Sequence, residues 1–230
     1  AGILFAGGPW NIQRSPVVRQ DLVPCMAMMS AQHTATMSDV ATICFDGDSL
    51  FELAIQTLTG KGCRRPAILI GKGYDQQLAK LRPALAAHDL SYDPILLQGV
   101  ALEQPELAEH VTALWMRLPE DERPDGIFVA DDNLVEWACS GLLHAGVRPG
   151  VDMPVAVHTN FSTRPGGPMP LDRIGYNIRA LVQHFIGTTD ARRRGEAFEQ
   201  HTPLPAIHEE DIETTTNDVL PAMEPAGMPV

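Results

Sequence analysis

Polar side chains stand directly after several short apolar runs of this sequence. In a parallel α/β sheet, ligands bind beyond the carboxyl ends of the strands, so these positions are the candidates for chemistry. They are Gly7, Gly8, Ser30, Asp46, Asp48, Lys72, Tyr74, Asp131, Asp132, Thr159 and Asn160. Carboxylates accept paired hydrogen bonds from hydroxyls or amines, and the rings of Trp10, Tyr74 and Tyr176 would cover apolar patches. The set predicts a site for a polyhydroxylated or cationic small molecule.

Some of these side chains have an alternative role in the fold. An aspartate at the start of a helix accepts hydrogen bonds from free backbone N–H groups, and Asp48 and Asp132 are equally consistent with such N-caps. Capping and ligand binding are compatible. His158 ends a predicted strand and is the one histidine whose position suggests the site, with a purely structural role as the alternative.

The sequence carries no motif of a known type of catalytic site. GKG at residues 71–73 follows a predicted strand but lacks the spacing of a phosphate-binding loop, so we interpret it as a turn. GxSxG and HExxH motifs are absent, and the neighbours Asp131 and Asp132 would diverge instead of facing one substrate bond. The four cysteines have no metal-ligand spacing and are expected to be buried free thiols. We expect no catalytic residue, no metal site and no cofactor.

The elements that position these side chains are predicted from hydrophobic periodicity. Apolar runs bounded by Gly, Pro or Asp predict buried parallel strands at residues 2–6, 25–29, 41–45, 66–70, 126–130 and 154–158. Helical periodicity predicts helices beginning near Leu50 and Leu134 and at residues 75–88, 105–118 and 178–194. This alternation is typical of βαβ units and of an α/β fold.

Two helix starts have the spacing of a capping box. Ser49 precedes Glu52 by three residues, and Asn133 precedes Glu136 by the same interval. The segment from residue 214 to residue 230 is polar and then punctuated by prolines, which predicts an irregular surface strap or tail.

Composition limits the partners of the chain. The 230 residues carry 17 Lys and Arg against 29 Asp and Glu, a net charge of -12, which disfavours binding to a phosphate backbone. No apolar run is long enough to cross a bilayer, and the first residues lack a signal-peptide pattern, so we expect a cytoplasmic protein without membrane contact.

The block PDGIFVADDN at residues 124–133, continued by LVEWACSGLLHAGVRPGVDMPVAVHTN, resembles the effector domain of LacI/GalR transcriptional regulators. DGDSLFELAIQTLTGKGCRRPAILIG and PLDRIGYNIRALVQHFIG are similar to further segments of that family. Cys63 stands where the family usually has His, Gln76 or Gln77 replaces a sugar-binding Arg, and Thr159 followed by Asn160 replaces an Asp. These departures argue against a simple sugar as the ligand, since lost charged partners weaken hydroxyl binding.

The resemblance implies two Rossmann-like lobes with parallel sheets, as in type I periplasmic binding proteins, with the first lobe incomplete. We expect residues 1–64 with 173–194 in the first lobe, 65–160 in the second, 161–172 as a crossover loop and 195–230 as a C-terminal strap. The ligand would be held by Asp46, Tyr74, Gln77, Asp131, Asp132, Thr159, Asn160 and Tyr176.

The implied function is that of an effector sensor, not an enzyme. A small polar molecule, with a carbohydrate as one candidate, would bind in the interlobe cleft of a repressor and control DNA binding. The resemblance implies a homodimer, which would contact operator DNA only through a headpiece that this chain lacks. The alternatives are a periplasmic solute-binding protein of a sugar transporter and an enzyme on a doubly wound sheet.

Overall fold

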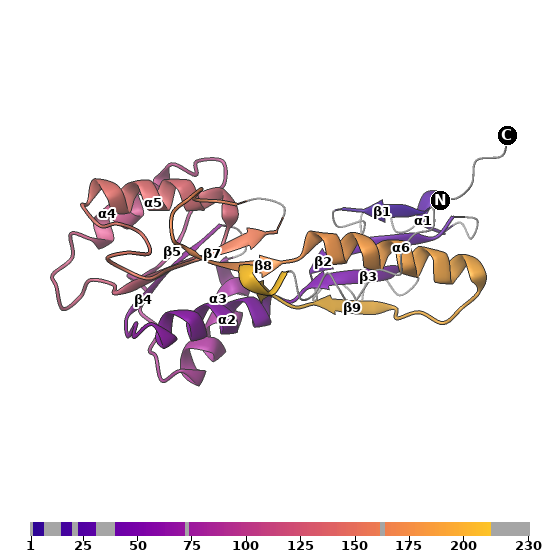
Figure 1. The fold of residues 1–230 in the computed structure, drawn as a ribbon, viewed down its shortest axis with the longest axis horizontal. Helices are drawn as coiled ribbons and strands as arrows, with labels where there is room; N and C mark the ends of the chain where they lie inside the picture. The colour runs from indigo at the N-terminus through magenta and orange to yellow at the C-terminus, as the bar shows by residue number, and fades with distance from the viewer. Residues whose placement is uncertain are drawn as a thin grey trace.

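The computed structural model describes residues 2–6, 15–19, 23–30, 40–71, 74–161 and 164–212. These residues form two α/β lobes placed end to end (Figure 1), each built on its own sheet. The first sheet has the strand order β1-β2-β3-β9 and the second has the order β10-β8-β7-β6-β4-β5. The fold is therefore the expected α/β class with two parallel-sheet lobes, and within these ranges no sheet continues from β3 into β4.

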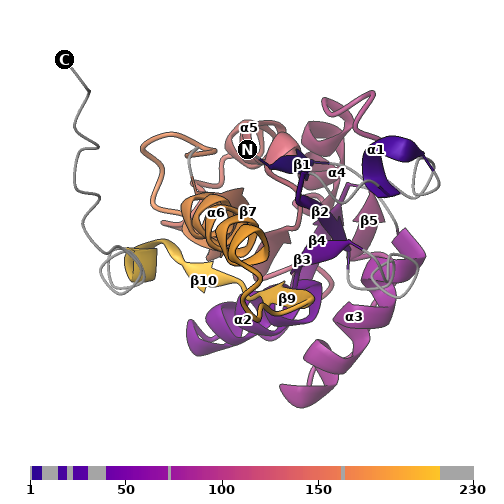
Figure 2. The ribbon, with the colours of Figure 1, turned by 90° about the vertical axis from the view of Figure 1, so that its right-hand side faces the viewer.

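The first lobe is a parallel sheet covered on both faces. Its strands are β1 (Ile3–Phe5), β2 (Cys25–Ser30), β3 (Ala41–Phe45) and β9 (His201–Leu204). Figure 2 shows α1 (Pro16–Arg19) and α6 (Ile178–Arg194) on opposite sides of this sheet. Strand β2 alternates accordingly, since Cys25 and Ala27 pack with Val18 of α1, whereas Met26 packs with Leu181 of α6.

The second lobe is doubly wound. Its strands are β4 (Pro66–Ile70), β5 (Leu97–Gly99), β6 (Gly126–Val129), β7 (Val155–Asn160), β8 (Asp172–Tyr176) and the antiparallel edge strand β10 (Ile207–His208). Its helices are α2 (Gly47–Gly60), α3 (Tyr74–Ala87), α4 (Leu107–Trp115) and α5 (Val135–His144). Ala67 and Leu69 of β4 face the α4–α5 side, while Ile68 and Ile70 face the α2–α3 side. A strand buried on both faces needs a continuous apolar run, and that is the pattern that identified β4.

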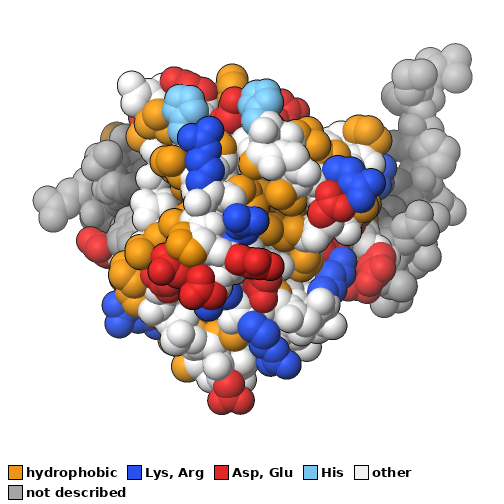
Figure 3. Space-filling view, turned by 90° about the vertical axis from the view of Figure 1, so that its left-hand side faces the viewer, with side chains coloured by type: hydrophobic (Ala, Val, Ile, Leu, Met, Phe, Trp, Pro, Cys, Tyr) orange, Lys and Arg blue, Asp and Glu red, His pale blue; other side chains and the backbone are white. Residues whose placement is uncertain are grey.

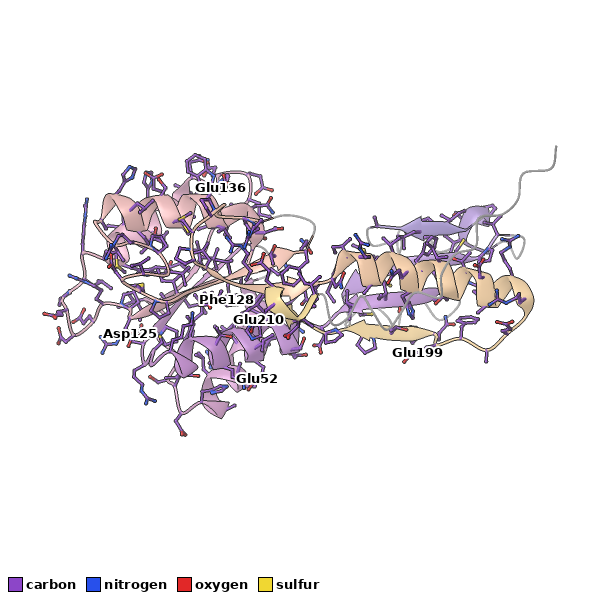
Figure 4. All side chains as sticks on the ribbon, viewed as in Figure 1. Glu52, Asp125, Phe128, Glu136, Glu199 and Glu210 are labelled. Atoms are coloured by element: carbon purple, nitrogen blue, oxygen red, sulfur yellow. The ribbon has the colours of Figure 1, made fainter. Side chains whose placement is uncertain are left out.

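The lobe boundaries differ from the division expected from the sequence. Helix α2 packs on the second sheet, where Phe51 stacks edge-on against Phe128 with ring centroids 5.6 Å apart, at the centre of the lobe (Figure 4). Strand β8 pairs with β7 in the same sheet, and within the expected C-terminal strap β9 joins the first sheet. The chain therefore leaves the first lobe after Phe45, because the apolar face of α2 matches the second core.

The helix starts also differ from the predicted capping boxes. Asp46 caps α2 by accepting from the backbone N–H groups of Asp48 and Ser49, and Asp131 caps the 3-10 turn η3 (Asp132–Leu134) by accepting from Asn133. Helix α2 thus begins earlier than predicted, with Asp46 at the end of β3 as its cap, whereas α5 begins at Val135 and is preceded by η3, which Asp131 caps. Neither Asp48 nor Asp132 is an N-cap, since Asp48 lies two residues after the cap Asp46 and Asp132 lies one residue after the cap Asp131.

The four cysteines are buried thiols outside any disulfide, as the sequence predicted; they are Cys25, Cys44, Cys63 and Cys139. Cys63 donates to Asp125 Oδ1 over 2.8 Å, and burial raises the pKa of this thiol. Asp125 also accepts from the backbone of Arg64 and Arg65, and so closes the turn at the end of the second lobe that lies away from the first (Figure 4). Cys63 is therefore a structural residue.

Within the described residues, no helix is both long and apolar enough to cross a membrane. The same residues contain no group of three or more His, Cys, Asp or Glu side chains that could hold a metal ion. On the outer end of the second lobe, acidic and basic side chains are interspersed (Figure 3). The described part of this face carries no uniform charge that would favour a polyanionic partner.

Candidate functional site

A cavity of about 430 Å³ opens at the carboxyl ends of β6 and β7. Its lining comprises Phe45, Gly47, Leu50, Gln76, Gln77, Lys80, Ala130, Asp131, Asp132, Asn133, His158, Asn160 and Tyr176. Phe45 ends the last strand before the chain crosses to the second lobe, so the cavity lies where the two lobes meet. This is the position at which a parallel α/β sheet binds ligands.

Asp131 and Asp132 follow β6 and have different partners. Asp131 Oδ1 accepts from the backbone N–H of Asn133 over 3.1 Å and from its Nδ2 over 2.8 Å. Asp132 Oδ2 accepts from Asn160 Nδ2 over 3.1 Å, which links the end of β6 to the end of β7. Asp131 therefore holds the helix start, while Asp132 faces the neighbouring strand and the cavity.

His158 and Asn160 are alternate residues of β7 and point to the same side, since side chains repeat every second position along a strand. Both ring nitrogens of His158 are out of contact with solvent and have no hydrogen-bond partner among the described residues. Burial lowers the pKa of His158, although Asp132 and Asp131 oppose this shift. The ring is therefore a neutral imidazole that can donate one hydrogen bond and accept another.

Three chain crossings connect the lobes and are joined to one another by hydrogen bonds, and two of them, at Phe45 and at Tyr176, line the cavity. Tyr176 Oη donates to the backbone carbonyl of Asp46 over 3.0 Å, and Asp46 N–H donates to the Leu204 carbonyl over 2.9 Å. The backbone N–H of Ala206 donates to Ser49 Oγ over 2.9 Å. Burial raises the pKa of Tyr176, so its hydroxyl stays protonated and remains a donor. These bonds form one hinge region through which both lobes are connected.

The ring of Tyr176 connects the hinge to the cavity. Its centroid lies 4.6 Å from that of Phe45 and 5.7 Å from that of His158. A change of lobe orientation that moved the ring of Tyr176 would therefore also change the packing around His158.

The structure brings together Gln77, Asp131, Asp132, Asn160 and Tyr176 of the predicted site. Asp46 borders the site through its backbone, while its carboxylate caps α2. Thr159 is fully buried on the opposite side of β7 and does not line the cavity, because it alternates with His158 and Asn160.

Some predicted candidates lie outside the described residues, namely Gly7, Gly8, Trp10 and Lys72. For Ser30 and Tyr74 the structure describes the backbone but not the side chain. The backbone of Tyr74 begins α3.

The strand-end rule missed several lining residues that come from helices. Gln76 and Lys80 lie one turn apart on α3, and Leu50 lies in the first turn of α2. The spacing of four residues is the signal that could have placed Gln76 and Lys80 on one face of α3. Nothing in the local sequence of Leu50 distinguishes it from other core leucines.

A larger cavity of about 620 Å³ lies on the flank between α2 and the C-terminal turn. Four of its charged side chains form two ion pairs, with Lys61 Nζ 2.5 Å from Asp172 Oδ1 and Arg173 Nη1 3.6 Å from Glu209 Oε2, while Glu210 is exposed. Arg173 also donates to the carbonyls of Gly167 and Met169. Because these groups satisfy one another, we assign the site to the smaller cavity between the lobes.

No protein-family model and no curated protein matches the sequence. Solved structures do match. A regulatory protein of the LacI family from Chloroflexus aggregans aligns with a TM-score of 0.68 and 19% identity, over 90% of this chain and 74% of that protein. The complex of the transcriptional regulator CelR with cellobiose aligns with a TM-score of 0.70 and 20% identity, over 90% of this chain and 64% of CelR.

The chain has the fold of LacI-family regulators. The lactose repressor bound to the anti-inducer ONPF gives the same result, with a TM-score of 0.67 and 18% identity over 86% of this chain and 71% of the repressor. The resemblance found in the sequence is confirmed at the level of the fold. At sequence identities of 18 to 20%, the shared fold does not by itself establish a function, so the function of this chain has to be argued from its own site residues.

Proposed function

We propose that this chain is the effector-sensing part of a transcriptional regulator, binds a small polar molecule between its lobes and catalyses no reaction. One observation carries the proposal, namely the cavity in which Asp132, His158 and Asn160 converge beside Tyr176 of the hinge. A ligand that contacts these residues touches both the second sheet and the connection between the lobes. It would favour one lobe orientation through its different affinity for the open and closed states.

The solved structures support a regulator over the alternative of a transporter's solute-binding protein, since those compared above are regulators. The named ligand cellobiose of the CelR complex supports a polar, carbohydrate-sized effector. We infer a cytoplasmic protein whose control of operator DNA requires a DNA-binding headpiece.

The test is calorimetric titration of the purified chain with a panel of mono- and disaccharides, amino sugars and nucleosides. We expect a member of the panel to bind the wild-type chain and to lose affinity in Asp132→Asn, by about 1 to 3 kcal/mol if the carboxylate is the acceptor. Asp121→Asn removes an equal charge at an exposed position outside the cavity and should bind like the wild type.

Equal affinity in wild type and Asp132→Asn would remove this cavity from the proposal. To separate the regulator from a transport protein, the full-length protein carrying the bound effector is tested for a change in affinity for its upstream DNA. No change on saturation with effector would contradict the regulatory function.

A further inference from the structure

The two aspartates of the cavity have no positively charged partner in the described structure. Lys80 is the one Lys or Arg among the described lining residues, and its Nζ lies 3.2 Å from Asp48 Oδ2. Asp131 and Asp132 accept hydrogen bonds from the amides of Asn133 and Asn160, which are neutral donors. Two negative charges at the cavity are therefore hydrogen-bonded but not neutralised.

The carboxylates also have unused acceptor capacity. An ionised carboxylate accepts about four hydrogen bonds. Asp132 accepts one from Asn160 at Oδ2 and a longer one of 3.3 Å from Asn133 at Oδ1. Asp131 Oδ2 lies against Gly71, where the Cβ of any other residue would collide with it. Gly71 thus leaves the space in which this carboxylate stands beside the cavity.

His158 is a second and independent sign that a ligand belongs here. An unpartnered polar group in the interior is costly, so two such nitrogens in one ring are unusual in a stable fold. The ring lines the cavity beside the carboxylates and stands edge-on to Tyr176. A ligand that reached it would satisfy groups that the described residues leave without partners.

From this geometry we propose that the effector is a cationic small molecule, an amine whose ammonium lies at Asp131 and Asp132 and whose neighbouring polar group pairs with His158. The inference rests on the proposed function and specifies its ligand. An anionic effector is disfavoured, because the described lining offers no cation that is not already paired. A neutral polyol would form hydrogen bonds but leave both charges uncompensated.

The experiment compares amines with matched alcohols. Glucosamine and glucose, galactosamine and galactose, and tyramine and tyrosol are titrated calorimetrically at pH 6.5, and each pair differs in one amine. We expect the amine of at least one pair to bind about tenfold tighter than its alcohol, the difference between a charge-assisted and a neutral hydrogen bond. This preference should shrink with added salt and vanish in Asp132→Asn, whereas Asp121→Asn should keep it.

His158→Phe keeps an aromatic ring against Tyr176 but removes both nitrogens. We expect this variant to lower the affinity for the amine at least as much as the affinity for its matched alcohol. Its melting temperature should be unchanged or higher, which would show that the fold is intact. Unchanged amine affinity in His158→Phe would overturn its assigned contact.

Tighter binding of an alcohol that is lost in Asp132→Asn would overturn the cationic class and leave the proposed function standing. Equal binding of both members of every pair would do the same. Absence of binding by every probe at millimolar concentration, in a chain shown to be folded, would count against the inference and the proposed function together.

Discussion

Neighbouring residues of one type have different roles at the end of β6. Asp131 points toward the N–H of Asn133 and caps the first turn of a helix, whereas Asp132 contacts Asn160 on the adjacent strand. A difference of one position changes the direction of the side chain. The carboxylate of Asp131 therefore stabilises the fold, whereas that of Asp132 is placed to bind the proposed ligand.

Asp131→Ala should lower the free energy of unfolding by about 1 kcal/mol, because the cap of η3 is lost. Asp131→Asn should keep most of that stability, since an amide oxygen also caps. Asp132→Asn should change the free energy of unfolding by less than about 0.5 kcal/mol while lowering the affinity for the ligand. Urea denaturation of the three variants measures this, and a larger loss in Asp132→Asn than in Asp131→Ala would contradict the assignment.

Burial lowers the pKa of His158 in the folded chain below its unfolded value near 6.5. As pH falls below that value, the unfolded chain binds a proton that the folded chain refuses, so the free energy of unfolding falls. The stability that His158 contributes is thus present above pH 6.5 and is lost toward acid.

As the pH is lowered from 7.5 to 5.5, the free energy of unfolding should fall less in His158→Phe than in the wild type. Urea denaturation at each pH measures this. The pKa of His184 is lowered by burial as well, so His184→Phe should remove a separate part of the same slope. Parallel pH profiles of wild type and His158→Phe would show that the imidazole is not held neutral.

Helices α4 and α5 approach each other closely at a glycine. A Cβ at Gly141 would collide with Thr112 Oγ1 and the Glu109 carbonyl, and Thr112 Oγ1 also donates to the Ala138 carbonyl over 3.0 Å. This contact holds the two helices against one face of the second sheet, and their position determines where η3 places Asp132.

Gly141→Ala should therefore destabilise the chain by about 1 to 3 kcal/mol through overpacking. A Cβ at Gly187 of α6 would meet no atom within 4 Å, so Gly187→Ala should stabilise by up to about 1 kcal/mol through helix propensity. Thermal melts of both variants compare the same substitution in two helices. Equal shifts in melting temperature would contradict the close packing of α4 and α5.

At the scale of the molecule, the lobes are joined by three crossings that exchange hydrogen bonds. Tyr176 Oη is the one side-chain hydroxyl that links the β8 crossing to the β3 crossing among the described residues. Its ring contacts to Phe45 and His158 do not depend on that hydroxyl.

Tyr176→Phe should cost about 0.5 to 1.5 kcal/mol of unfolding free energy, the net value of one hydrogen bond. The two lobes should also sample more orientations, which small-angle scattering detects as a broader distance distribution. An unchanged distribution and an unchanged stability would show that the hinge bond contributes nothing.

Apolar side chains remain exposed on α4 and α5, with Leu114 at 59% and Trp137 at 40% exposure. We expect a homodimer through such apolar lobe surfaces, in line with the two-fold symmetry of most regulators. Leu114→Glu should weaken the association in sedimentation experiments, and Asp121→Asn should not. A monodisperse monomer of the wild type at high micromolar concentration would contradict the dimer.

Much of this molecule follows from local pattern. Apolar runs with sharp boundaries identify β2, β3, β4 and β6, and the 3.6-residue period identifies α2 to α6, because burial on known faces requires those repeats. The rule that ligands lie beyond strand ends places Asp131, Asp132 and Asn160 among the candidates from the sequence alone, although it also selects Thr159, which does not line the cavity.

Only the tertiary structure decided which sheet each element joins. The periodicity of α2 and β8 does not identify the lobe that each joins, because that choice depends on complementary surfaces formed by residues distant in sequence. The same holds for the site, because Lys80 reaches it from the middle of a helix and Thr159 turns away by the alternation of β7. Sequence determines the period of each element, whereas side-chain direction in a shared cavity depends on how the elements pack together.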